Sequence, residues 1–229
     1  MMRAAPLLLL SAFALAASAA SCGPGAVPIR EGTRAFTPSD YGGVYDRWTR
    51  SADDFDFGHL AEVLHVTATF ESWEFRWAYV VRYAADHSLT TDERTRTLEQ
   101  SLADARARHR FLVTVGVPIF REGDLTGTYS DVRVVLVDPT GRQTTPSEIL
   151  QIRRPSTDQR VYFPSINRQR HTFRIAFPTI GDDGAPTIPA DAQEVILRFA
   201  GALGTVDLHW NLDQAEPVGA TPVVTGPGN

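Results

Sequence analysis

The segment VILRFAGALGTVDLHWNL, residues 195–212, decides the fold class of this chain. Apolar side chains recur in it at every second position: Val195, Leu197, Phe199, Val206, Leu208, Trp210 and Leu212. A period of two places successive side chains on opposite faces of a β-strand, and the stretch from Gly201 to Gly204 supplies turn residues between the two halves. The segment therefore predicts a hairpin of two antiparallel strands with one buried face.

The same period recurs along most of the chain and predicts further strands. We expect them over residues 64–70, 75–83, 132–137 and 171–177, the first two joined as a hairpin and the third followed by a turn at Pro139 and Gly141. Seven or eight such strands indicate an all-β chain, an antiparallel β-sandwich of immunoglobulin-like type. A closed barrel is the alternative architecture.

One segment departs from the strand pattern. Thr90 and Glu93 have the spacing of a capping box, in which each side chain satisfies an otherwise free backbone N–H at the start of a helix. We expect one inserted α-helix over about residues 91–108, with a narrow apolar stripe that lies across an edge or end of the sheets.

Composition and charge exclude several classes of function. Hydrophobic residues make up 43% of the 229 and charged residues 21%, which is typical of one folded domain with a buried core. The net charge of -5 argues against a nucleic-acid partner. All 22 basic residues are arginine, so Schiff-base catalysis and a phosphate-loop lysine are excluded.

The first residues have the pattern of a secretion signal. A basic start at Arg3 precedes an apolar run over 7–15 that is too short to span a membrane, and small residues then lead to Cys22, the one cysteine of the chain. The residues Ala19, Ala20, Ser21 and Cys22 resemble the lipobox of bacterial lipoproteins. The resemblance implies that Cys22 is acylated and becomes the mature N-terminus, and Gly23 suggests sorting to the outer membrane; an ordinary signal cleaved near Ala19 is the alternative.

These signals divide the chain into four parts. We expect a signal peptide over 1–21, a lipidated cysteine with a flexible tether over 22–50, a β-sandwich domain over 51–216 and a disordered tail over 217–229. Glycine and proline are frequent in the tether and the tail, and neither part shows apolar periodicity.

Acidic residues suggest a weak cation site before the first predicted strand. Asp53, Asp54, Asp56 and His59 lie close together, and carboxylates at alternating positions suit calcium, with Asp54 and Asp56 as the candidate ligands. The EF-hand spacing is absent, so an exposed loop is the favoured interpretation and we expect no metal or other cofactor. Asp182, Asp183 and Gly184 are interpreted as a turn.

Two further groups are candidates for binding. Trp48 and Trp73 fall near predicted strand ends, where flat rings can stack on sugars. Five arginines are clustered around a strand that we expect near Val161: Arg153, Arg154, Arg160, Arg168 and Arg170. Such a cluster can hold an anionic polysaccharide, lipid headgroups or an acidic protein surface, and the alternative is a solvated face.

The sequence thus predicts an exported, membrane-anchored envelope lipoprotein whose non-catalytic sandwich binds an envelope protein or polysaccharide. Signatures of serine nucleophiles, helical zinc sites and nucleotide-binding loops are missing from it. A carbohydrate or cell-wall binding module is the first alternative. An envelope hydrolase, with a metal near Asp53 and His59, is the second.

Overall fold

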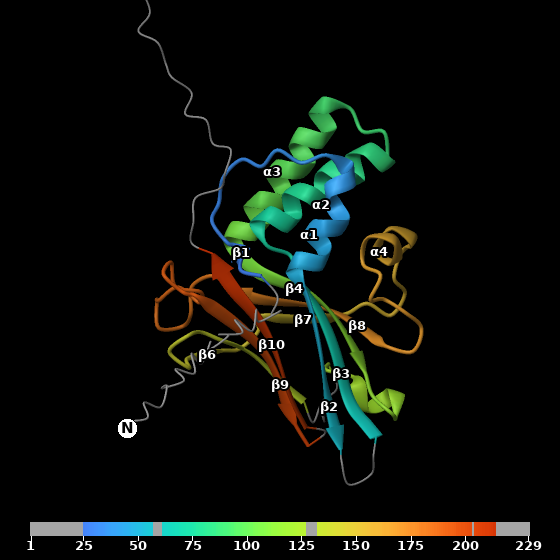
Figure 1. Ribbon diagram of the computed structural model, residues 1–229, viewed down its shortest axis with the longest axis vertical. Helices are drawn as coiled ribbons and strands as arrows, with labels where there is room; N and C mark the ends of the chain where they lie inside the picture. The colour runs from blue at the N-terminus through green and yellow to red at the C-terminus, as the bar shows by residue number, and fades with distance from the viewer. Residues whose placement is uncertain (1–24, 57–60, 127–131, 203, 214–229) are drawn as a thin grey trace, which may run out of the picture.

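The computed structural model describes residues 25–56, 61–126, 132–202 and 204–213. Within these ranges the chain is mostly β and forms two five-stranded sheets that pack as a sandwich, with helices grouped at one end (Figure 1). The predicted β-sandwich is confirmed at this level. The predicted signal peptide, Cys22, the end of the domain from 214 and the C-terminal tail lie outside the described residues.

The first sheet contains the hairpin that decides the fold class. Its strands, in spatial order, are β1 (Val27–Pro28), β10 (Gly204–Asp213), β9 (Glu194–Gly201), β5 (Val132–Val137) and β6 (Gln143–Thr144). Strands β9 and β10 pair antiparallel with Leu197 opposite Leu208, and the alternate residues of β10 are buried as predicted. Strand β1 joins the free edge of β10 in parallel, with Val27 opposite Leu212.

The second sheet carries the helices and loops that build the candidate sites. Its strands, in spatial order, are β2 (Thr49–Asp56), β3 (Ala61–Phe70), β4 (Arg108–Gly116), β8 (His171–Pro178) and β7 (Glu148–Gln151). All of these pairings are antiparallel. Sequence analysis missed β4, because Phe111–Val115 are all buried and no period of two is left to detect.

The core lies between the two sheets. Phe111 of β4 stacks on Phe70 of β3 with ring centroids 4.6 Å apart, and it meets Trp210 of β10 at 5.5 Å. Phe173 of β8 and Phe199 of β9 are also fully buried in the same apolar cluster. Burial of several large aromatic side chains from both sheets, at about 25 cal/mol for each Å² removed from water, is the main force that holds the sandwich together.

The predicted strand over 75–83 is wrong. These residues belong to helix α2 (Trp73–Asp86), whose N-terminus is capped by the Ser72 hydroxyl, an acceptor for the Phe75 backbone N–H at 3.2 Å. Phe75, Tyr79 and Tyr83 are four residues apart, so they fit a period of two and also one face of a helix. Their rings are stacked along that face.

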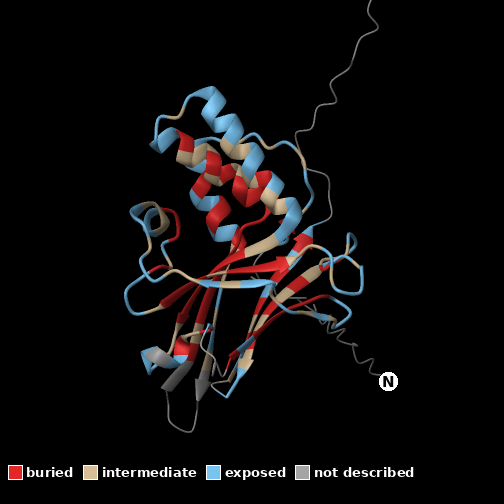
Figure 2. Ribbon diagram, turned by 180° about the vertical axis from the view of Figure 1, so that it is seen from behind, coloured by how far each residue is buried: buried red, intermediate tan, exposed pale blue. Residues whose placement is uncertain are grey.

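The described residues contain more helices than the single one expected. They are η1 (Pro38–Asp40), α1 (Tyr41–Trp48), α2, α3 (Thr91–Ala107), η2 (Phe120–Gly123) and α4 (Thr157–Tyr162). Helix α3 confirms the prediction for 91–108, including the capping box of Thr90 and Glu93, and buries only Leu102. The helices turn their buried sides toward one another and the sheets (Figure 2).

The tether predicted for 22–50 does not extend to residue 50. Val27 is fully buried in β1, and helix α1 buries Val44 and Trp48 in the main core. The Trp48 indole N–H donates to the Glu74 carboxylate at 2.7 Å, and the Trp210 indole N–H donates to the Trp48 carbonyl at 3.0 Å. This part of the chain is therefore part of the folded domain, despite its many glycines.

Candidate anion-binding site

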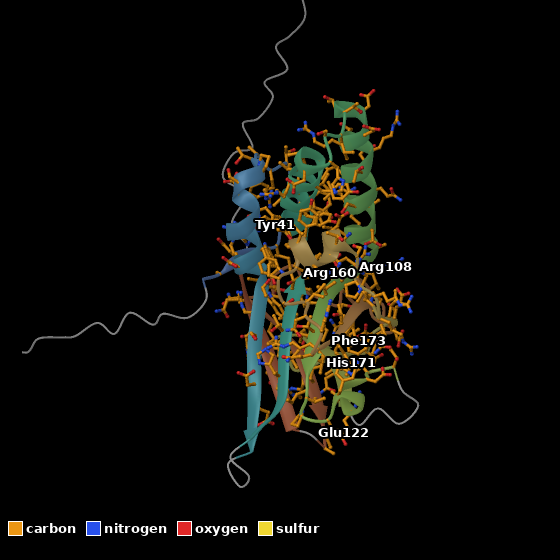
Figure 3. The ribbon with its side chains drawn as sticks, turned by 90° about the vertical axis from the view of Figure 1, so that its right-hand side faces the viewer. Tyr41, Arg108, Glu122, Arg160, His171 and Phe173 are labelled. Atoms are coloured by element: carbon orange, nitrogen blue, oxygen red, sulfur yellow. The ribbon has the colours of Figure 1, made fainter. Side chains whose placement is uncertain are left out.

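The clustered arginines converge on one pocket. A hollow of 560 Å³ is lined by all five of them: Arg153, Arg154, Arg160, Arg168 and Arg170. An adjoining hollow of 350 Å³ shares Phe120, Arg153 and Arg170 with it and adds Asp124 and His171. We call the two hollows together the arginine groove; Arg160 and His171, which border it, are labelled in Figure 3.

Three short segments of the chain position the arginines. Arg153 and Arg154 follow β7, Arg160 lies on α4, and Arg168 and Arg170 lie on the connection from α4 to β8. The segment around Val161, expected to be a strand, is instead the end of α4.

Helix α4 begins with a capping box that fixes its start. The Ser156 hydroxyl accepts the Gln159 N–H at 3.1 Å, and the Gln159 side-chain oxygen accepts the Ser156 N–H at 2.9 Å. The sequence Ser-Thr-Asp-Gln at 156–159 carries this helix-start signal, which our sequence analysis overlooked.

Among the described residues, the hydrogen bonds of the groove arginines go to neutral acceptors. Arg153 donates from Nε to the Gln151 side chain at 2.8 Å, and Arg160 donates to the Pro155 carbonyl at 2.9 Å. Arg170 reaches the Thr67 hydroxyl at 3.4 Å. Within the described ranges, none of the five lies within ion-pair distance of a carboxylate, whereas Arg82, Arg142 and Arg198 elsewhere all do.

One carboxylate lines the groove, and it already accepts hydrogen bonds from a neighbouring residue. Asp124 accepts the Thr126 hydroxyl at 2.6 Å and the Thr126 N–H at 2.9 Å. The hydroxyl hydrogen bond is the largest effect that holds the pKa of Asp124 below its ordinary value, and the charge of Arg153 adds to it. Five guanidinium groups therefore face one carboxylate in the groove, which leaves a strong positive excess.

An exposed aromatic ring borders the same groove. Phe120 is 52% exposed and stacks on His171, with ring centroids 3.8 Å apart. The Gln151 amide nitrogen lies 3.0 Å from His171 Nδ1, and Nε2 of the same ring contacts the Phe120 carbonyl. These contacts on both ring nitrogens, together with the ring stacking, hold the Phe120 ring in place.

Gly123 makes the close packing of η2 on His171 possible. A Cβ at this position would lie 2.9 Å from Cδ2 of the His171 ring, closer than side chains tolerate. The groove thus combines fixed cationic side chains with a flat apolar surface. Guanidinium groups bind phosphate and carboxylate through paired hydrogen bonds, so the groove suits an anionic ligand that also offers a face to Phe120.

The two tryptophans predicted to stack on sugars are not available for that role. Trp48 is 0% exposed and lies in the core. Trp73 is 9% exposed, its indole N–H donates to the Gly32 carbonyl at 2.8 Å, and the Arg106 guanidinium lies 4.7 Å from its ring centroid. Both were placed at strand ends in the prediction, but each lies at an end of a helix, one in α1 and the other in α2.

The acidic cluster does not form a metal site in the part of the chain that the structure describes. Asp53 and Asp54 lie in strand β2, which was expected to be a loop; the Asp53 carboxylate contacts His65, and Asp54 accepts the Thr205 N–H at 2.8 Å. The side chain of Asp56 and all of His59 are outside the description. No group of three potential metal-ligating side chains occurs among the described residues.

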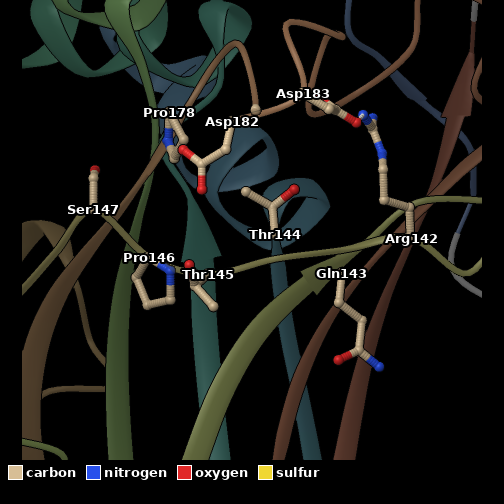
Figure 4. Close-up of a pocket in the computed structure, with 10 residues that line it drawn as sticks. Arg142, Gln143, Thr144, Thr145, Pro146, Ser147, Pro178, Asp182 and Asp183 are labelled. Atoms are coloured by element: carbon tan, nitrogen blue, oxygen red, sulfur yellow. Dashed lines mark hydrogen bonds and ion pairs between the residues drawn. The ribbon is translucent and has the colours of Figure 1, made fainter.

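The turn predicted at Asp182 to Gly184 is confirmed, beside a pocket of 530 Å³ (Figure 4). Asp183 is paired with Arg142, whose Nη1 donates at 2.9 Å. Arg142 also donates from Nε to Asp138 at 3.0 Å. This charge-compensated pocket is less suited to an anion than the arginine groove.

Comparisons with known proteins add little to this description. A solved crystal structure of a protein of unknown function from Burkholderia pseudomallei is similar to this chain, with 13% identity, a TM-score of 0.35, and coverage of 78% of this chain and 90% of that one. No protein-family model matches the chain, and no curated protein matches it. Among the described helices, none is long and apolar enough to cross a membrane. The function is therefore argued from the arginine groove.

Proposed function

We propose that this protein is an exported envelope lipoprotein, anchored through an acylated Cys22, whose sandwich is a non-catalytic binding module for an acidic polysaccharide. The observation that carries the binding proposal is the arginine groove, where five arginines with no carboxylate partner among the described residues line one hollow with the exposed Phe120 ring. The anchor and the outer-membrane location rest on the lipobox resemblance. The immunoglobulin-like classification remains a prediction that the binding proposal does not need.

The shape and position of the groove favour a polymer over a membrane surface. A hollow of 560 Å³ can accept charged sugar units, whereas lipid headgroups present a flat layer that contacts exposed protrusions. The N-terminal strand β1 and helix α4 lie on opposite sides of the molecule in Figure 1. A chain anchored near β1 would thus turn the groove away from its own membrane.

The test is binding of polygalacturonate, a polymer of uronic acids, to the purified mature protein in low salt by isothermal titration calorimetry. Each exposed arginine should contribute about 1 kcal/mol, so Arg153→Gln combined with Arg168→Gln should weaken binding about 30-fold. The matched control changes Arg94 and Arg96, two exposed arginines of α3, to Gln and should leave the affinity within about twofold.

Three results would contradict the proposal. Equal weakening in the control would show attraction by overall charge. Absence of binding by the unchanged protein would exclude an acidic polysaccharide of this kind. Tighter binding to phosphatidylglycerol vesicles than to the polymer, lost in the groove variant, would assign the groove to lipid headgroups.

A further inference from the structure

A second cavity lies between the helices and the second sheet. It has a volume of 460 Å³, and residues of α2, α3, β4 and β8 line it. It shares no lining residue with the arginine groove. We call it the charged cavity, because five of the residues around it are ionisable and interact: Glu71, Arg76, Asp104, Arg110 and Arg174.

Three arginines of the charged cavity surround the Glu71 carboxylate. The nearest contacts are 3.3 Å from Arg110 Nε, 3.7 Å from Arg174 Nε and 3.9 Å from Arg76 Nη2. Arg76 lies 2.8 Å from Asp104 through Nη1, and Arg110 also contacts Asp104. Both acidic residues are therefore shared among several cations.

Within the described part of the chain, the ion-pair network around the charged cavity has one unmatched positive charge. Asp104 also pairs with Arg108 at 3.1 Å, and Arg108 lies 3.5 Å from Glu148. Four arginines (Arg76, Arg108, Arg110 and Arg174) thus meet three carboxylates (Glu71, Asp104 and Glu148). Arg108 is labelled in Figure 3, where β4 leaves the helical layer.

Several donors in the charged cavity have no hydrogen bond inside the protein. Nine buried side-chain atoms in the described residues lack a partner, and five of them belong to this network. Three of the five are donors: Nη2 of Arg76, a side chain that is 4% exposed, and Nε of Arg110 and Arg174, which all lie 3.3–3.9 Å from Glu71 without making a hydrogen bond to it. The other two are acceptors, Oε1 of Glu71 and Oδ2 of Asp104. A buried donor without an acceptor costs about 1–3 kcal/mol, so three such donors around one cavity indicate an anionic acceptor there.

Three aromatic side chains form another part of the wall. Phe75 and Phe163 have ring centroids 5.7 Å apart, and Tyr79 lies 6.3 Å from each of them. Burial, followed by the charge of Glu71, raises the pKa of Tyr79 to about 12, so its phenol stays protonated. The charged cavity therefore has a cationic side and an aromatic side within one small volume.

We infer that the charged cavity binds a small organic monoanion, a carboxylate joined to an apolar or aromatic body. One negative charge balances the network, and the ligand carboxylate accepts the hydrogen bonds that Nη2 of Arg76 and Nε of Arg110 and Arg174 do not make to Glu71. A dianion would reverse the imbalance in a poorly solvated space, where uncompensated charge is costly. The apolar body lies against Tyr79 and Phe163, and the volume is within the range of small-molecule sites.

The test uses the purified mature protein and three probes: phenylacetate, its neutral isostere phenylacetamide, and inorganic phosphate. Binding is measured by titration followed in NMR spectra of the tyrosine and phenylalanine rings. Phenylacetate should bind at millimolar concentration or tighter and shift signals of Tyr79 and Phe163, and the other two probes should bind at least tenfold more weakly.

Two variants and a control locate the binding site. Arg174→Gln removes the unmatched charge and should weaken phenylacetate binding at least tenfold. Ser101→Leu keeps every charge but fills the cavity, and it should also weaken binding, which preserves the test if the first variant does not fold. Arg133→Gln, on an exposed position of β5 in the other sheet, should bind as the unchanged protein does.

Specific outcomes would overturn the inference. Equal binding of phenylacetamide would remove the need for the anion, and equal binding of phosphate would remove the need for the apolar body. Unchanged affinity in a folded Arg174→Gln or Ser101→Leu protein would place the ligand elsewhere, and failure of phenylacetate to bind would exclude this ligand class. None of these results depends on the arginine groove.

Discussion

Replacing Trp48 with phenylalanine tests whether the segment before β2 belongs to the folded domain. The indole N–H donates to a buried Glu74 carboxylate at 2.7 Å, and Arg47 forms an ion pair with the same carboxylate at 3.4 Å. Loss of a hydrogen bond to a charged acceptor costs about 1.5–3 kcal/mol, and the smaller ring removes about 1 kcal/mol of packing. We expect Trp48→Phe to lower the free energy of unfolding by about 3 kcal/mol.

The assay is urea unfolding followed by circular dichroism, with a double-mutant cycle. Glu74→Gln makes the acceptor neutral, so Trp48→Phe should cost about 1–2 kcal/mol less in that background. A loss below about 0.5 kcal/mol for Trp48→Phe is what a residue in a flexible tether would give. That result would refute the packing of α1 on the core.

Three further outcomes are expected. Burial lowers the pKa of His109 to about 4 from an ordinary 6.5, so the unfolded chain binds more protons than the folded protein between these pH values. The free energy of unfolding measured in urea should therefore fall by about 2 kcal/mol from pH 7 to pH 5. His109→Phe should abolish this loss. Gly204→Ala should lower the melting temperature more than Gly141→Ala. Both glycines have positive φ, but only at Gly204 would a Cβ lie 2.7 Å from Cγ of Asp54. Equal losses of melting temperature would contradict this contact. In a lipoprotein-competent bacterium, Cys22→Ala should remove both the acyl mass measured on the intact protein and its membrane association; an unmodified, soluble form of the unchanged protein would exclude the anchor.

The strands that sequence analysis found are those with one face toward the core and one toward polar surroundings. In β10, Val206 and Leu208 are buried and Asp207 and His209 are not, so alternation is visible. In β4, Leu112 and Thr114 are as buried as their neighbours, so the pattern disappears. Alternation reports the asymmetry of a strand's environment, and it misses a strand that is covered on both faces.

Helix α2 shows the opposite error, a strand predicted where the chain forms a helix. Aromatic residues at 75, 79 and 83 repeat every four positions, which is a multiple of two, so the strand pattern was satisfied by a helical face. Ser72 was the local signal that distinguishes a helix from a strand here. A serine hydroxyl three residues before Phe75 can accept the Phe75 backbone N–H and is a typical N-cap. The Glu74 side chain, which accepts the Trp48 N–H, has no sequence signal because that pairing spans 26 residues.

The sequence could predict the arginine groove but not the charged cavity, because the residues of the two sites are spaced differently along the chain. The arginines of the groove lie within 18 residues of one another, so their clustering was visible along the chain. The charged cavity joins Glu71, which directly follows β3, with Arg110 of β4 and Arg174 of β8, and these residues meet only through strand pairing. A site assembled by long-range pairing becomes visible only when the register of the sheet is known.

The folded state of residues 27–48 also changes the consequences of the proposed anchor. Strand β1 fixes Val27 beside Leu212, so four residues separate Cys22 from the domain instead of almost thirty. At about 3.6 Å for each residue step from Cys22 to Val27, an acylated Cys22 would hold the β1 edge within about 18 Å of the bilayer. Helix α4, which carries Arg160 of the arginine groove, lies on the opposite side in Figure 1, so the groove would then face outward at a nearly fixed height. Such geometry suits capture of a polymer that lies next to the membrane, and it disfavours a ligand that the domain would have to reach across a long tether.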